Sequence, residues 1–300
     1  MNLELGVKAS GTFKVQVLSK KKELIKESDW QNNLILDQAI DRLFFGWFAP
    51  AFLYVGTGNS TPTTSQVGLD APFAAEGGLV ASTENFLDRA PYGTFTHNAE
   101  YQFEQGSIVG NIAELGITDG DNVYLTRALI KDSLGNPTTI SVAADQILRV
   151  FYSIEITIPD WFSQTVIDIN GTSTTVSATN YYNSEAMAGG TGSVRGVAYD
   201  ADDDITDPTV RSVIHNRSSD EPLDIWYESS DSSEVSPTSR QYDFEFSADS
   251  ANFTSGISHI QVLGIRSAHC PILLQFNPRI VKSDLDVLNI SLTYSVTRTT

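Results

Sequence analysis

The sequence predicts a mainly β protein, built from antiparallel β-sandwich lobes with one helix near the N-terminus. The clearest observation is residues 148–158, where every second residue from Leu148 is apolar and the residues between are polar, apart from Phe151. A period of two over such a length is typical of a strand with one face on a core and one in water. Turn-forming sequences, Asp119-Gly120 and residues 134–137, interrupt the preceding segment and divide it into strands.

The length and the change of composition along the chain predict two domains. Three hundred residues are enough for two domains or for one large β-domain with long loops. We expect a first β-rich domain at 1–158, which carries the helix, and a second β-rich lobe at 159–300. Residues 183–250 are rich in Ser, Gly, Asp and Thr, so we expect long acidic and Ser-rich loops there.

The charge excludes two classes of partner. Acidic residues outnumber basic ones 37 to 19, for a net charge of −18, whereas a protein that binds nucleic acid or an anionic membrane needs a basic patch. We therefore expect no nucleic acid and no membrane, and we interpret the acidity as favouring solubility. The N-terminus lacks the pattern of a signal peptide, and Cys270, the single cysteine, permits no internal disulfide.

The first fifty residues predict a hairpin followed by a helix. The hairpin comprises Thr12–Leu18, a turn at three lysines and Glu23–Glu27. The helix is expected at about 33–48, because its apolar residues recur at helical spacing and Asn32 or Asn33 can cap it. A capping box formed by Ser28 and Gln31 would instead start the helix one turn earlier.

The helix ends in an aromatic sequence, and a glycine-rich loop follows. Phe45–Phe48 is expected either in the core or in a contact between subunits, where aromatic residues are enriched. After a short strand at Phe52–Gly56, the segment Gly56–Pro62 contains a Gly-Thr-Gly sequence. No Lys-Ser/Thr pair follows it and no helix opens on it, so we interpret it as an ordinary loop and not as a phosphate-binding one.

The second half contains another hairpin signal and a possible repeat. Asn170-Gly171 predicts a tight hairpin turn. Val262–Ile265 echoes Glu114–Ile117, and residues 288–296 repeat the alternating pattern of the first half. Two related lobes are one hypothesis, and two unrelated sheets that end similarly are the other, because the helix has no clear second copy.

No catalytic, cofactor-binding or metal-binding residue is predicted, and no cofactor. The histidines are scattered and no nucleophile motif occurs. Residues 200–207 mimic the first half of a calcium loop, but Ile205 and Arg211 occupy positions that require Gly and Glu, so an acidic surface loop is the preferred interpretation. Glycoside cleavage needs two carboxylates close together, and with so many acidic residues a sheet could bring two of them together. A glycan-degrading enzyme is therefore the third functional alternative.

Several motifs, in order along about residues 30–158, resemble those of structural proteins of tailed-bacteriophage virions. In that family a helix start with two asparagines precedes a "VGTGN-TP" loop, and a block beginning "ELGI" closes the domain. The matching segments here are Asn32–Asp37, Tyr54–Pro62, Glu114–Ile117, Leu125–Asp132, Gly135–Ile140 and Leu148–Tyr152.

The resemblance implies a non-enzymatic subunit of the virion. We expect it to be made in the host cytoplasm and to assemble with copies of itself, and with other virion proteins, in the tail or neck/collar region. The leading alternative is a β-sandwich module of a tail fibre that recognises host-surface glycans through its loops, for which exposed aromatic residues would be candidates. Those candidates are Tyr181, Tyr182, Trp226 and Tyr227.

Overall fold

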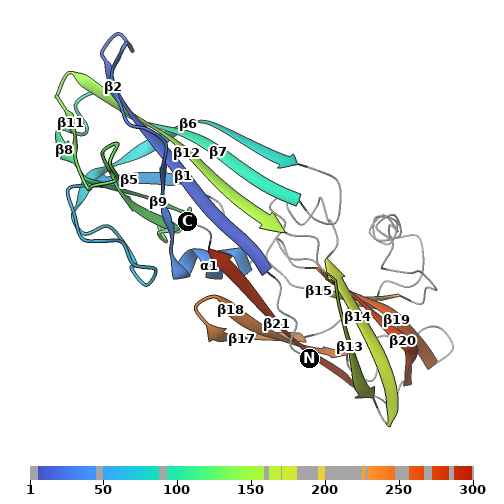
Figure 1. Ribbon diagram of the computed structural model, residues 1–300. Helices are drawn as coiled ribbons and strands as arrows, with labels where there is room; N and C mark the ends of the chain where they lie inside the picture. The colour runs from blue at the N-terminus through green and yellow to red at the C-terminus, as the bar shows by residue number, and fades with distance from the viewer. Residues whose placement is uncertain are drawn as a thin grey trace.

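The mainly β fold is confirmed by a computed structural model of the chain. Among the described residues it contains 21 β-strands and one α-helix. The structure describes residues 6–44, 50–87, 93–158, 162–169, 171–180, 195–199, 225–226, 229–246, 257–266, 272–283 and 287–298. Figure 1 shows a large sheet at the upper left, a smaller one at the lower right, and the helix α1 (Asp37–Phe44) beside the large sheet.

The large sheet has β1 (Gly6–Ser19) near its middle. On one side, in spatial order, lie β12 (Gln146–Ile158), β7 (Gly93–Phe103), β6 (Pro72–Leu87), β5 (Phe52–Gly56), β9 (Glu114–Thr118), β10 (Thr126–Leu129) and β4 (Leu34–Ile35). On the other side lie β21 (Leu288–Arg298), β18 (Ser239–Phe246) and β17 (Ser229–Ser236), while β2 (Leu24–Glu27) and β3 (Gln31–Asn32) also pair with β1.

Two smaller sheets complete the described structure. A two-stranded ribbon contains β8 (Gly110–Ile112) and β11 (Ile140–Val142). The second large element is a six-stranded sheet in the order β13 (Phe162–Ile169), β14 (Thr172–Asn180), β20 (Ile272–Ser283), β19 (Ile257–Arg266), β15 (Arg195–Tyr199) and β16 (Ile225–Trp226).

The predicted alternation of residues 148–158 is confirmed in β12. Its even-numbered side chains from Leu148 to Ile156 are at most 1% exposed, whereas Phe151 on the other face is partly exposed. In β1, Phe13 pairs with Tyr152 and Val15 with Val150 across the strands, so both strands turn the same face to the core. Burial of these side chains, at roughly 1.5–3 kcal/mol each, is the main stabilisation of this part of the sheet.

The predicted hairpins and turns are confirmed. β1 and β2 pair antiparallel around the lysine turn, and β13 and β14 pair antiparallel around Gly171, whose φ is 81°. Gly135 also has a positive φ, 83°, in the turn where Asp132 accepts hydrogen bonds from the backbone of Leu134 and Asn136. Glycine adopts this left-handed conformation at no steric cost, which explains why these turns form where the sequence places them.

The predicted start of the helix, at about residue 33, is wrong. Helix α1 begins at Asp37, because the preceding residues form β3 and β4. Asn33 is 6% exposed, and its backbone N–H donates to the Gly11 carbonyl at 3.0 Å. Neither Asn33 nor the alternative Ser28, whose hydroxyl accepts from the Val15 N–H, therefore caps the helix. The aromatic segment 45–48 lies outside the described residues.

The large sheet curls so far that its last strand, β4, contacts β1 near its middle. β3 pairs with β1, β4 pairs with β10, and β4 contacts β1. The short segment that was expected to be helical thus closes the sheet around one core. The core is filled by buried side chains from several strands, among them Phe13, Leu53, Tyr101, Phe103, Leu115 and Tyr152.

The chain passes repeatedly between the two large sheets. β17, β18 and β21 follow residue 158 but belong to the first sheet, where β21 runs parallel to β1. The strands that contain the echoed sequences, β9 and β19, lie in different sheets, whereas β12 and β21 lie on either side of β1. A domain boundary at residue 158 and a duplicated lobe stay predictions.

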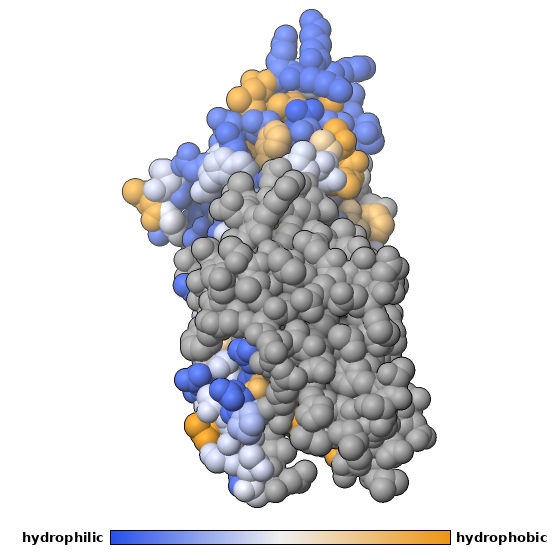
Figure 2. Space-filling model, turned by 90° about the vertical axis from the view of Figure 1, so that its right-hand side faces the viewer, coloured by the Kyte–Doolittle hydropathy of each residue, from blue (hydrophilic) through white to orange (hydrophobic). Residues whose placement is uncertain are grey.

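The described surface has a mixed character. In Figure 2, hydrophobic residues form small groups among hydrophilic ones. Within the described ranges, no helix has the length and apolar character needed to cross a membrane.

Candidate functional site

The most elaborate polar cluster in the described structure is built on two buried residues of opposite charge. Glu114 lies in β9 and Arg127 in β10, and both side chains are 0% exposed. The antiparallel register pairs Ala128 with Leu115, so Arg127 and Glu114 fall on the same face. The Arg127 Nε and Nη2 atoms donate to Glu114 Oε2 at 3.0 and 2.8 Å.

Arg127 also binds the loop that connects β5 to β6. Its Nη1 donates to Gln66 Oε1 at 2.6 Å, and its Nη2 donates to Asp70 Oδ2 at 2.7 Å and Ser60 Oγ at 3.3 Å. A guanidinium has five N–H donors in a fixed planar arrangement, so one arginine can hold several loop residues at once. We call Glu114, Arg127 and these three loop residues the loop clamp.

The Glu114 carboxylate binds the backbone of the same loop. Its Oε1 accepts from the N–H groups of Gly58 at 3.0 Å and Ala71 at 2.8 Å, and its Oε2 accepts from the Asp70 N–H at 3.1 Å. Together with Arg127 these groups give the carboxylate five hydrogen bonds. A buried charge is tolerated when it is paired and hydrogen-bonded in this way.

The two glycines of the Gly-Thr-Gly sequence allow the backbone to approach Glu114. A Cβ at Gly58 would lie 2.3 Å from Glu114 Oε1, and one at Gly56 would lie 2.6 Å from the same atom. Neither distance leaves room for a side chain. The loop therefore surrounds a carboxylate from its own chain, which agrees with its interpretation as an ordinary loop.

Asp70 is held ionised by its neighbours. Hydrogen bonds from the Ser60 hydroxyl and backbone N–H, with the positive charge of Arg127, lower the pKa of Asp70 below its ordinary value. The side chain is 31% exposed and lies at the outer end of the clamp. The clamp's hydrogen-bonding atoms are thus directed at one another and at the loop backbone, an arrangement that holds the loop in place.

Helix α1 is tied to its surroundings by charged side chains on both sides. Asp37 and Asp41, one helical turn apart, face arginines from the C-terminal strands. Arg298 of β21 pairs with Asp37 and donates from its Nε to the Ile35 carbonyl at 2.8 Å. The remaining ion pairs join Arg240 Nη2 to Asp41 Oδ1 at 2.8 Å, and Arg42 to Asp119 at 2.8 Å and to Asp121 at 3.1 Å.

Most residues singled out from the sequence as candidate sites lie outside the described residues. These are the acidic segment 200–207, Arg211, Tyr181, Tyr182, Tyr227 and Cys270; of Trp226 only the backbone in β16 is described. His97 is buried in β7. Among the residues that the structure does describe, no group of His, Cys, Asp and Glu is arranged to hold a metal ion.

The loop clamp was not predicted from the sequence, although a signal for it exists. Glu114 and Arg127 are single charges of opposite sign in two neighbouring apolar segments, at Ile112–Ile117 and Leu125–Ile130. A charge in such a strand is seldom buried unless it is paired. Recognising the pair requires the knowledge that the two strands are adjacent.

No protein-family model, curated protein or solved structure matches this chain.

Proposed function

We propose that this chain is a non-enzymatic structural subunit of a tailed-phage virion, which assembles with copies of itself and with other virion proteins in the tail or neck/collar region. The observation that supports this function most is the convergence of three resembling motifs on the loop clamp. The segment Tyr54–Pro62 supplies Ser60 of the clamp and the Gly58 N–H that donates to Glu114. The segment Glu114–Ile117 supplies Glu114, and Leu125–Asp132 supplies Arg127.

The convergence gives these motifs a structural reason. The side chains that act in an enzyme are expected to face a cavity where a substrate can reach them. Here the side chains of Glu114 and Arg127 are fully buried and hold a loop of a β-rich scaffold. A virion subunit needs such a scaffold, because it must keep its shape while it packs against neighbouring subunits.

The chain path also suits a durable building block. Strands from both ends of the chain, β1 and β21, lie side by side, and the arginines of β18 and β21 bind helix α1. Local opening of one sheet therefore disturbs contacts with the other end of the chain. One chain used many times is normally arranged with closed symmetry, so we propose a symmetric homo-oligomer.

Sedimentation velocity and native mass spectrometry of the purified chain at micromolar concentration test this function. We expect one discrete oligomer with a defined number of subunits. A monomer at every concentration would contradict self-assembly.

A further inference from the structure

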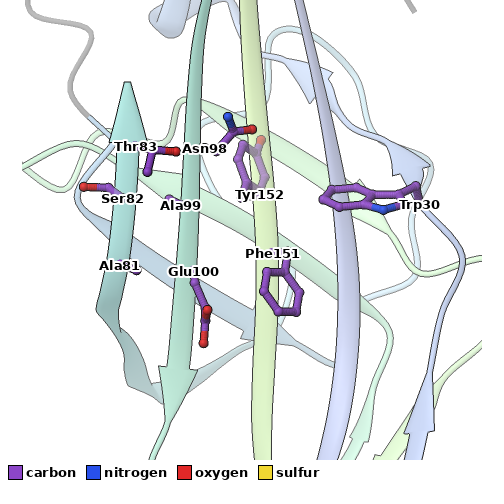
Figure 3. Close-up of a pocket in the computed structure, with 9 residues that line it drawn as sticks. All are labelled: Trp30, Ala81, Ser82, Thr83, Asn98, Ala99, Glu100, Phe151 and Tyr152. Carbon is purple, nitrogen blue, oxygen red and sulfur yellow. The ribbon is translucent and has the colours of Figure 1, made fainter. Parts of the chain in front are cut away.

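A hollow lies on the outer face of the large sheet, on the opposite side from the core. It has a volume of about 270 Å³ and spans β6, β7 and β12, with Trp30 at its border (Figure 3). The strand register builds its floor, because Ala81, Glu100 and Phe151 lie opposite one another across the three strands. Thr83 and Asn98 form the next row. Its volume is just below the range of about 300–1,000 Å³ of drug-sized pockets, so it suits one ring-sized ligand.

Trp30 provides an aromatic wall. It lies in the linker between β2 and β3, its side chain is 55% exposed, and in Figure 3 its indole points from this linker toward Phe151 and Tyr152. Phe151 is the one apolar residue on the polar face of β12 and is partly exposed. Both aromatic residues are therefore placed where they contribute little to the core but can contact a ligand.

Polar groups without partners surround the aromatic residues. Within the described part of the chain, the hydroxyl of Thr83, the amide of Asn98 and the indole N–H of Trp30 have no hydrogen-bond partner. These groups include both donors and acceptors, and all of them border the hollow. A ligand with several hydroxyl groups could bond to them while one of its faces packs on the indole.

The charges near the hollow are already paired. Glu100 binds Arg149 at 3.0 Å, and Lys14, opposite Phe151 on β1, binds Glu27 at 2.7 Å. No cation in this described region is thus left over for an anionic ligand, and the net charge of −18 further disfavours one. The surroundings favour a neutral ligand.

We propose that this hollow binds one ring of a neutral saccharide, with the ring face on Trp30 and its hydroxyls on Asn98 and Thr83. The site is separate from the loop clamp, and it adds carbohydrate binding to the structural role. It also differs from the loop aromatics that the sequence suggested for glycan binding, since it is formed by the sheet itself.

Saturation-transfer difference NMR with methyl glycosides of glucose, galactose, mannose and N-acetylglucosamine, and with methyl α-sialoside, tests the proposal. We expect signals for at least one neutral glycoside and weaker ones for the sialoside. Trp30→Ala should weaken binding by about tenfold or more, and Asn98→Ala should also weaken it. Leu134→Ala, which removes a side chain that is 84% exposed on a distant turn, is the matched control and should bind like the wild type.

Three results would overturn the proposal. One is the absence of any signal from the neutral glycosides at millimolar concentration. Another is equal signals from Trp30→Ala and wild type when circular dichroism shows both to be folded. The third is a change of sedimentation coefficient in Trp30→Ala with no change in glycoside binding, which would assign this face to contacts between subunits.

Discussion

Replacing Glu114 by glutamine tests the loop clamp directly. The substitution keeps the size of the side chain but removes its charge and turns one acceptor oxygen into an N–H₂ group. That group would face donors, because both oxygens of Glu114 accept hydrogen bonds, from three backbone N–H groups and from Arg127. Arg127, which is 0% exposed, would lose its buried counter-charge.

The expected loss of stability follows from these contacts. Removing one partner of a buried ion pair costs about 3–5 kcal/mol, and an orphaned buried N–H costs about 1–3 kcal/mol. Because these costs overlap, we expect Glu114→Gln to lower the free energy of unfolding by about 3–5 kcal/mol. Arg127→Met should cost a similar amount, and the double variant should cost about 1–3 kcal/mol less than the sum, because the two residues interact directly.

Urea unfolding followed by tryptophan fluorescence and by far-UV circular dichroism measures these changes. Glu155→Gln is the matched control, since Glu155 is an exposed strand glutamate, and should change stability by no more than about 0.5 kcal/mol. Limited proteolysis should cut Glu114→Gln within residues 57–71, the loop that the clamp holds. Unchanged stability and unchanged proteolysis of Glu114→Gln would refute the structural role of the clamp.

Three further outcomes are expected. Gly58→Ala should destabilise the protein by about 2–4 kcal/mol, because the new Cβ would lie 2.3 Å from the clamp carboxylate. Gly120→Ala is the control and should be nearly neutral in the same urea assay, because nothing lies within 4 Å of its new Cβ. Folding lowers the pKa of Asp70, so the ionised Asp70 side chain stabilises the protein above the ordinary pKa of 3.8, and this stabilisation is lost as the pH falls below that value. Asp70→Asn should therefore reduce the change of the urea midpoint with pH in this acid range, and an unchanged pH dependence would contradict the role of Asp70. Arg298→Met should cost about 1–3 kcal/mol and increase hydrogen exchange in helix α1, while Lys8→Met on the exposed side of β1 should do neither.

The parts of the fold that depend on local rules could be predicted from the sequence. The alternation in β12 indicates one buried face whatever the partner strands are, and the turns at Gly135 and Gly171 follow from the conformational freedom of glycine. These features need no knowledge of the rest of the chain.

The parts that depend on distant contacts could not be predicted. Asn33 is a good helix cap by propensity, but its backbone N–H donates to the Gly11 carbonyl of β1. This contact with a distant strand outweighs the local preference of Asn33 for the start of a helix. The parallel pairing of β21 with β1 joins the two ends of the chain and has no local signal. The loop clamp combines both difficulties, because Glu114 and Arg127 meet only when β9 and β10 are adjacent.

Mass spectrometry of purified phage particles whose genome encodes this chain tests the proposed function most directly. The structural role predicts that the intact chain copurifies with the particles through a density gradient, in a fixed stoichiometry to the other tail or neck proteins. Absence of the chain from infectious particles, with its presence only in the soluble fraction of the infected cells, would contradict it.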